Sequence, residues 1–139
     1  MAPGQAGRNA LSLGPIISFD ADFQSFRYAI AGSGGAAATT ATTSELATSL
    51  QQGITLKKAL KAPRVHHSGA PDVALLEASV PEKIKYGLEQ LGHRTEVVPA
   101  LGKVNAVECP LGLDARTENI ACFVHADPRG AGMAVEAER

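Results

Sequence analysis

The residues Gly32-Ser33-Gly34-Gly35 have the types and spacing that most clearly point to chemistry. Glycine permits positive φ angles and lets a ligand approach the backbone closely. A helix that starts directly after such residues leaves its first N–H groups unpaired and carries partial positive charge there. The pattern therefore predicts an anion site, although a tight strand-to-helix turn without a ligand has the same sequence signature.

One candidate anion is a dinucleotide phosphate, because Gly32-x-Gly34-x-x-Ala37 fits the tolerant form of the dinucleotide-binding fingerprint. That fingerprint also requires a second strand after the helix, ending in an acidic residue that binds a ribose. Glu45 lies inside the expected helix, and residues 53–67 offer no such strand. A dinucleotide- or anion-binding domain built on Gly32–Gly35 is therefore the less favoured alternative.

The adjacent histidines His66 and His67 lie in the segment APRVHHSGAPD, residues 62–72. Neighbouring residues of a strand point to opposite faces, so the two imidazoles cannot both bind one metal ion. No Cys, His or Asp group stands at ligand spacing nearby in the sequence. We expect packing or hydrogen-bonding histidines in a rigid turn, and no metal site.

The sequence contains no recognisable motif for a catalytic nucleophile. Ser33 lacks the spacing of a G-x-S-x-G elbow, and the sequence contains no local Ser/His/Asp or Cys/His arrangement. Cys109 and Cys122 fit best as small buried hydrophobic residues on neighbouring strands. The sequence leaves open whether they form a disulfide.

The elements that must position these residues alternate between strands and helices. Period-two apolar patterns and turn residues predict strands at residues 15–19, 26–31, 64–67, 72–78, 95–99, 105–109 and 120–125, with a loop at 110–119. We expect the first two strands to pair as a hairpin. Helices are expected at residues 36–52, 56–61 and 79–91.

Helix ends are the best marked positions of this pattern. Gly53 and Gly92 stand where left-handed helix stops are needed, and Thr55 can cap the second helix. Ser79 and Glu82 have the spacing of a capping box. One face of the third helix collects the apolar residues Val80, Ile84, Leu88 and Leu91.

Bulk composition describes one ordinary globular domain spanning residues 1–139, with a loose segment at 1–9 and a frayed tail at 130–139. The net charge is −1, with 45% hydrophobic residues. This gives no electrostatic reason to expect binding to nucleic acid or an anionic membrane. We also find no apolar run long enough to span a bilayer and no signal segment at Met1–Arg8.

Three stretches resemble the γ-glutamyltransferase family (γ-glutamyltranspeptidase, or glutathione hydrolase), specifically the C-terminal part of its small subunit. They are NALSLGPIISF (residues 9–19), AGSGGAAA (31–38) and KAPRVHHSGAPD (61–72), supported by LGKVNAV (101–107) and ADPRGAG (126–132). The resemblance implies an α+β layered fold that forms part of the αββα sandwich of N-terminal nucleophile hydrolases. It also implies acyl transfer from a γ-glutamyl substrate without a cofactor.

In that family a threonine at the start of the small subunit attacks the γ-glutamyl amide, and its own amine serves as base. By position, Gly34 and Gly35 inherit the role of the oxyanion hole. Ser12 matches one residue of a serine pair that holds the substrate's α-carboxylate, whereas Leu11 replaces the other. The anion predicted to bind at Gly32–Gly35 would then be the tetrahedral intermediate of acyl transfer.

The resemblance also implies that the nucleophilic threonine lies upstream, where this chain does not reach. Thr39, Thr40, Thr42 and Thr43 are expected inside a helix and have no free amine. We therefore expect a chain that is inactive alone, exposes an apolar face, and associates with the missing large subunit, the upstream half of the small subunit, or itself. A non-catalytic truncated remnant is the alternative.

Overall fold

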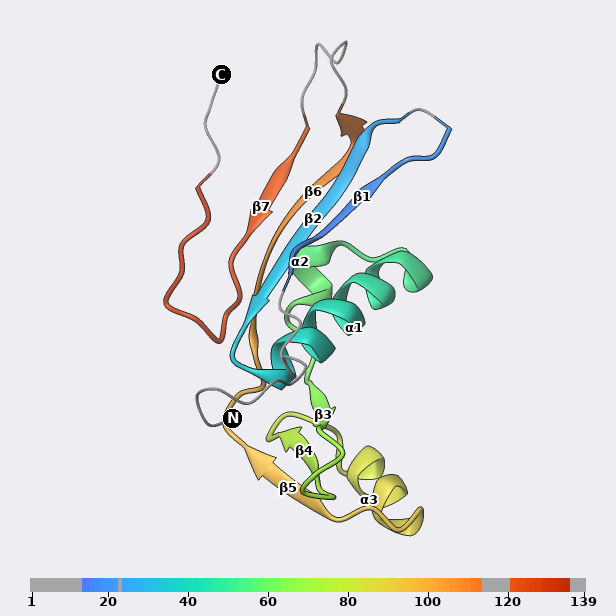
Figure 1. Ribbon diagram of the computed structural model, residues 1–139, viewed down its shortest axis with the longest axis vertical. Helices are drawn as coiled ribbons and strands as arrows, with labels where there is room; N and C mark the ends of the chain where they lie inside the picture. The colour runs from blue at the N-terminus through green and yellow to red at the C-terminus, as the bar shows by residue number, and fades with distance from the viewer. Residues whose placement is uncertain (1–13, 23, 114–120, 136–139) are drawn as a thin grey trace, which may run out of the picture.

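The computed structural model describes residues 14–22, 24–113 and 121–135 and has an α+β layered fold with two sheets (Figure 1). The larger sheet is antiparallel, with the order β1 (Ile16–Phe19), β2 (Phe26–Ser33), β6 (Lys103–Leu113), β7 (Phe123–His125). In the smaller sheet, β4 (Ala74–Glu77) lies between antiparallel β3 (Val65–His67) and parallel β5 (Thr95–Val98). The expected hairpin of the first two strands is confirmed.

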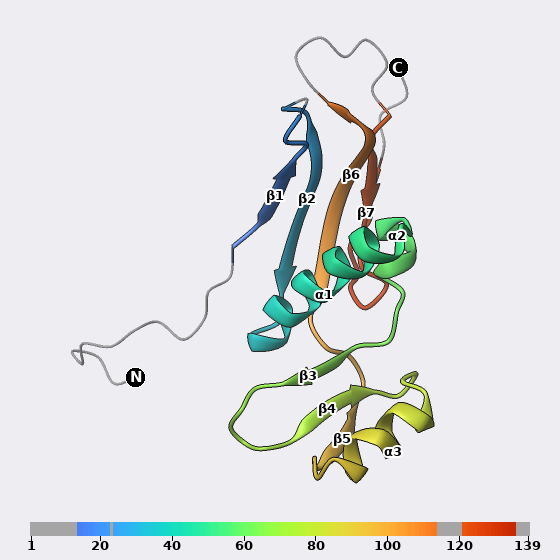
Figure 2. The ribbon, with the colours of Figure 1, turned by 90° about the vertical axis from the view of Figure 1, so that its right-hand side faces the viewer.

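Helices α1 (Ala36–Gln52) and α2 (Leu56–Ala59) lie against one face of the larger sheet (Figure 2). Apolar side chains from both layers form the core between them, namely Ile30, Ala41, Leu46, Leu56, Leu60, Val104 and Ala106. Gly32 of β2 makes this close packing possible. A Cβ atom there would lie 2.5 Å from Thr42 Oγ1 and 2.9 Å from the Ala38 carbonyl oxygen of α1.

The helix ends follow the expected local signals in the first two helices. Gly53 ends α1 in the left-handed conformation with φ 64°. The Thr55 side chain accepts a hydrogen bond from the Lys58 N–H at the start of α2, which ends at Ala59 and not at Lys61. Both predicted caps are therefore confirmed.

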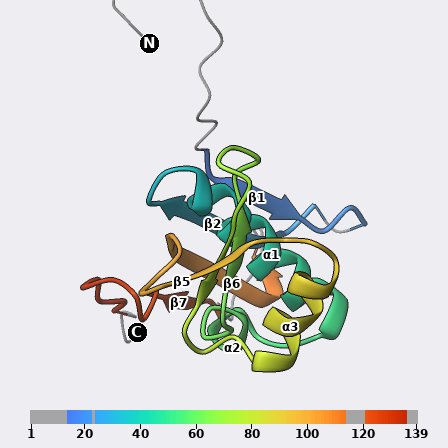
Figure 3. The same cartoon turned by 90° about the horizontal axis from the view of Figure 1, so that it is seen from below.

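The third helix differs from the prediction. Helix α3 runs only from Glu82 to Gln90, and no side chain caps it, so the predicted capping box from Ser79 is wrong. The reason is Pro81, because a proline disfavours helical angles at the residue before it. Helix α3 lies beside the smaller sheet at one end of the molecule, nearest the viewer in Figure 3. Its expected buried face is largely open, with Ile84 44% and Leu91 78% exposed.

The later strands also have shifted ends. Residues 110–113, expected in a loop, extend β6, and Leu113 pairs with Phe26 at the start of β2. The register is irregular between this pair and the pair Tyr28–Glu108. Strand β7 begins at Phe123, three residues later than expected. The rest of the predicted loop, the segment at 1–9 and the last residues of the tail lie outside the described residues.

Within the described residues, no helix lies on the second face of the larger sheet. Ala29, Ala31, Val107 and Val124 line an apolar groove of about 510 Å³ there, together with Met133 from the segment after β7. This surface agrees with the expectation of an uncovered apolar face, because a sandwich buries both inner faces of its sheets.

Candidate functional site

The glycine turn lies between the end of β2 and the start of α1. Gly34 and Gly35 both have positive φ angles, 107° and 71°, which glycine adopts without strain. Gly35 is the N-cap of α1, and no side chain caps the helix. The first turn of α1 contains no acidic residue, and residues 33–35 are exposed. The turn therefore presents an uncapped helix start to the outside of this chain, where partial positive charge can stabilise an anion.

Gly102, in the loop between β5 and β6, packs directly against the backbone of the turn and of the first residues of α1. Its φ is 67°, and a Cβ atom there would lie 3.1 Å from the Ala37 carbonyl oxygen. A Cβ atom on Gly34 would in turn lie 3.1 Å from Gly102 Cα. Close backbone packing thus fixes the position of the turn, with little room for a side chain.

Arg64, which precedes β3, ties that loop to the rest of the domain. Its Nε donates to Glu45 Oε1 at 2.8 Å, and its Nη1 donates to the carbonyl oxygens of Leu101 and Gly102 at 3.1 and 3.2 Å. Its Nη2 lies 2.8 Å from Asp127 Oδ2 as an ion pair, although the angle does not suit a hydrogen bond. The buried guanidinium of Arg64 therefore fixes the carbonyl of Gly102, the residue against which the glycine turn packs.

Glu77 and Arg129 form the second half of this charged cluster. Arg129 Nε and Nη2 donate to the two carboxylate oxygens of Glu77 at 2.5 and 2.6 Å. Glu77 also accepts from the backbone N–H groups of Arg64 and Leu101, both at 2.9 Å. Asp127 accepts from the Val104 N–H at 2.7 Å. The cluster joins α1, both sheets and the segment after β7.

The carboxyl groups of the cluster respond differently to burial. At Glu77, hydrogen bonds from Arg129 and from the backbone outweigh the desolvation caused by burial, so its pKa is lowered. The same balance lowers the pKa of Asp127. At Glu45, desolvation outweighs the attraction of Arg64 and raises the pKa. Glu45 is thus the acid whose charge this interior tolerates least.

This cluster explains why two separate motifs belong together. The sequence APR (residues 62–64) supplies Arg64, and DPR (127–129) supplies Asp127 and Arg129. Both motifs are visible in the sequence, but nothing in their residues predicts that they are in contact. Neither segment is apolar enough to predict burial of its charged residues, and the need for partners follows from the burial that the structure shows.

The other predicted residues take structural positions. Thr40 Oγ1 bonds His66 Nδ1 at 2.8 Å, and Thr42 Oγ1 donates to the Ala38 carbonyl at 2.7 Å, so both lie inside α1 as expected. His66 is buried and also bonds Ser68 Oγ, which confirms the hydrogen-bonding interpretation. Ser12 lies outside the described residues.

The question of the two cysteines is answered by the sheet. Cys109 of β6 and Cys122 before β7 are joined by a disulfide, with a Cα–Cα separation of 4.1 Å. The antiparallel pairing of Glu108 with Phe123 brings the two residues opposite each other. The structure therefore answers the question that the sequence leaves open, since the two residues are paired.

The dinucleotide alternative finds no support in the topology. After α1 and α2 the chain enters β3, which belongs to the smaller sheet, whereas β2 belongs to the larger one. Strand β2 has antiparallel neighbours on both sides. The parallel strand–helix–strand unit that a dinucleotide fingerprint requires is thus absent at this turn.

Comparison with known proteins identifies similar sequences and structures. A family model described as Gamma-glutamyltranspeptidase matches residues 2–137. A mutant Helicobacter pylori γ-glutamyltranspeptidase is similar at 23% identity with a TM-score of 0.75, over 91% of this chain and 66% of that chain. The Pseudomonas nitroreducens γ-glutamyltranspeptidase complexed with L-DON is similar at 25% identity with a TM-score of 0.77, over 99% of this chain and 67% of that chain. The Bacillus anthracis transpeptidase enzyme CapD is similar at 17% identity with a TM-score of 0.71, over 98% of this chain and 75% of that chain.

This chain thus spans about two thirds of the length of the similar chains from H. pylori and P. nitroreducens. The shared architecture is the layered fold of N-terminal nucleophile hydrolases, of which the described residues form a part. Among those residues, none of the helices has both the length and the apolar character needed to cross a bilayer.

Proposed function

Because the chain belongs to the γ-glutamyltranspeptidase family, we propose that it supplies the oxyanion-binding backbone of an acyl-transfer centre acting on γ-glutamyl compounds. The observation that carries this proposal is the turn at Gly34 and Gly35, which is exposed, uncapped and rigidly supported by Gly102. Preorganised backbone N–H groups of this kind stabilise charge that develops during a reaction.

In the proposed reaction a threonine hydroxyl attacks the carbonyl carbon of the γ-glutamyl amide. The C=O π bond breaks as the new C–O bond forms, and the electron pair moves to the carbonyl oxygen. The N–H groups of Gly34 and Gly35 donate hydrogen bonds to that oxyanion. The threonine's own amine takes the hydroxyl proton during the attack and passes it to the leaving nitrogen as the C–N bond breaks and the C=O bond re-forms. Water or an amino acid then attacks the acyl-enzyme, accepts the acyl group and restores the threonine hydroxyl.

We assign the nucleophile to protein outside the described residues. The α1 threonines support this assignment, because Thr40 and Thr42 use their hydroxyl groups within the fold and lie inside a helix. Ser12 remains the proposed contact of the substrate's α-carboxylate. The uncovered face of the larger sheet is where we place the complementary layer, from an upstream segment, a large subunit or a second copy.

The test removes one N–H group from a protein in which this chain is joined to a family segment that carries the nucleophilic threonine. Replacing the amide of Gly35 by a backbone ester deletes the N–H while leaving the glycine without a side chain. We expect turnover of a γ-glutamyl anilide to fall about 100- to 1000-fold, with a smaller change in KM. The 139-residue chain alone should give no turnover above background.

Two matched controls separate oxyanion binding from strain. Gly35→Ala keeps the N–H, and its Cβ meets no atom within 4 Å, so it costs mainly the strain of the positive φ. A backbone ester at Gly53, the positive-φ residue that ends α1, removes an N–H far from the turn. Full turnover by a folded Gly35 ester would refute the proposed role. Turnover by the chain alone would refute the assignment of the nucleophile.

The alternative of a non-catalytic remnant makes a different prediction. In that case the joined protein would mature and fold, yet the ester at Gly35 would change nothing because no acyl transfer occurs. Detection of a covalent acyl-enzyme by mass spectrometry after mixing with a γ-glutamyl anilide distinguishes the two functions.

A further inference from the structure

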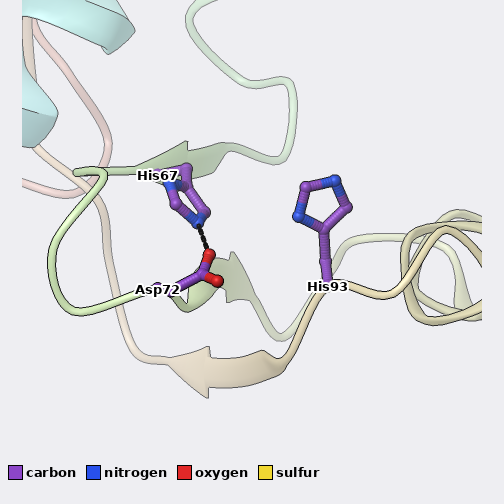
Figure 4. A group of neighbouring side chains, drawn as sticks. All are labelled: His67, Asp72 and His93. Carbon is purple, nitrogen blue, oxygen red and sulfur yellow. Dashed lines mark hydrogen bonds and ion pairs between the residues drawn. The ribbon is translucent and has the colours of Figure 1, made fainter.

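Three exposed side chains lie close together beside the smaller sheet (Figure 4). None of them belongs to the glycine turn. They are His67 at the end of β3, Asp72 in the loop before β4, and His93 in the turn between α3 and β5. One ligand atom from each lies within 4.8 Å of the others. His67 Nε2 is 3.0 Å from Asp72 Oδ1, and the two imidazole centroids are 5.9 Å apart.

Strand register explains why these residues meet. His67 pairs with Ala74, and Ala74 pairs with Thr95 on the next strand. Asp72 and His93 each precede one of those partners by two residues, and a spacing of two keeps side chains on the same face of a sheet. A backbone hydrogen bond from the Ala74 N–H to the Arg94 carbonyl, 2.8 Å long, joins the two segments.

The backbone that carries the three side chains is already fixed. The His93 N–H donates to the Leu88 carbonyl at 3.1 Å, and Gly92 has φ 91°, which is the C-terminal stop of α3. The Val73 N–H donates to the Pro71 carbonyl at 2.9 Å beside Asp72. A ligand at this place would therefore order side chains only, which lowers the entropic cost of binding.

We propose that His67, Asp72 and His93 bind a divalent transition-metal ion, and we assign zinc to the site. Two imidazole nitrogens and one carboxylate oxygen are a donor set typical of zinc, whereas calcium and magnesium prefer oxygen donors. Tetrahedral zinc places its ligand atoms about 3.3 Å apart. The exposed His93 side chain can rotate to close the remaining distance, and water completes the coordination.

The hydrogen bonds of His67 predict a specific proton rearrangement. The Gly69 N–H donates to His67 Nδ1 at 3.0 Å, so the neutral ring carries its proton on Nε2 and donates it to Asp72. Zinc bound at Nε2 displaces that proton, and Nδ1 takes one up, so the ring stays neutral. The exposed Gly69 N–H then bonds water instead.

The experiment is a zinc titration of the chain at pH 7.5 against a chromophoric chelator, with the imidazole ¹⁵N shifts followed by NMR. We expect one zinc ion per chain and a change of His67 from the Nε2–H to the Nδ1–H form. His93→Ala and Asp72→Asn should each weaken binding at least about tenfold, in the range known for altered metal sites. Asp22→Asn, an exposed aspartate outside the cluster, is the matched control and should leave binding unchanged.

Three results of the zinc experiment would overturn the proposal: no zinc binding, zinc affinity unchanged by both His93→Ala and Asp72→Asn, or no tautomer change at His67. Magnesium at the same concentration should leave the ¹⁵N shifts unchanged, and an equal response to magnesium would also refute it. The NMR readout uses the unaltered chain, so it decides the question even where a variant unfolds. The result is independent of the acyl-transfer proposal, since no residue of the glycine turn takes part.

Discussion

Glu77→Gln is the substitution for which the structure makes the sharpest stability prediction. Each carboxylate oxygen of Glu77 accepts one hydrogen bond from Arg129 and one from a backbone N–H group. A glutamine retains one carbonyl oxygen, but its NH₂ group would face one guanidinium donor and one backbone donor in either orientation. The Arg129 guanidinium, only 12% exposed, would also lose the nearer of its two carboxylate partners and keep only the 3.3 Å contact of its Nη1 with Asp127 Oδ1.

The expected cost follows from this loss. Removing one partner of a buried ion pair costs about 3–5 kcal/mol. Domains of this size have a total stability of roughly 5–15 kcal/mol, so the loss is a large part of the whole. With a urea m-value of about 2 kcal/mol per M, the unfolding midpoint should fall by about 2 M at pH 7.

The pH dependence gives a second, independent readout. The folded-state pKa of Glu77 lies below its ordinary value of 4.5. Its ionised form therefore contributes stability above pH 4.5, and this contribution is lost as the pH falls through the folded-state pKa. The difference in unfolding free energy between the unaltered chain and Glu77→Gln should thus narrow on acidification.

Urea unfolding followed by far-UV circular dichroism at pH 7 and at lower pH measures both quantities. Glu96→Gln, an exposed glutamate on β5 of the same sheet, is the control and should change stability by less than about 0.5 kcal/mol. A Glu77→Gln variant as stable as the control at pH 7, or one whose deficit grows at low pH, would show that this carboxylate does not hold the cluster together.

Two further predictions use the same unfolding assay. Glu45→Gln should lower the free energy of unfolding at pH 7 by less than Glu77→Gln does. Burial raises the folded-state pKa of Glu45 above its ordinary value of 4.5. The stabilising contribution of this carboxyl group is therefore present below pH 4.5 and is lost as the pH rises through the folded-state pKa. Its deficit should therefore grow on acidification, and a deficit that shrinks would contradict the assigned pKa direction. Replacing Cys109 and Cys122 together by alanine should cost about 3 kcal/mol, because their disulfide closes a short loop with a sequence separation of 13. Equal midpoints for the oxidised chain and the double variant would contradict this estimate.

Local signals in the sequence predicted the elements near the candidate site well. The strand before Gly32, helix α1, its stop at Gly53 and the Thr55 cap all depend on contacts within a few residues, so composition and spacing were sufficient. The predicted start of α3 is wrong because Pro81 disfavours helical angles at Val80, and this restriction overrides the capping-box pattern of Ser79 and Glu82. The family motifs likewise depend on residue order alone.

The sequence by itself determined the strand–glycine–helix unit, the helix stops and the membership of a family, because these properties are encoded in neighbouring residues. Only the tertiary structure decided that Arg64 pairs with Asp127, that Glu77 pairs with Arg129, and that His93 lies beside His67. These contacts join residues far apart in the chain. They depend on the order and register of strands in two sheets, which are set by the packing of the whole domain and by no local pattern.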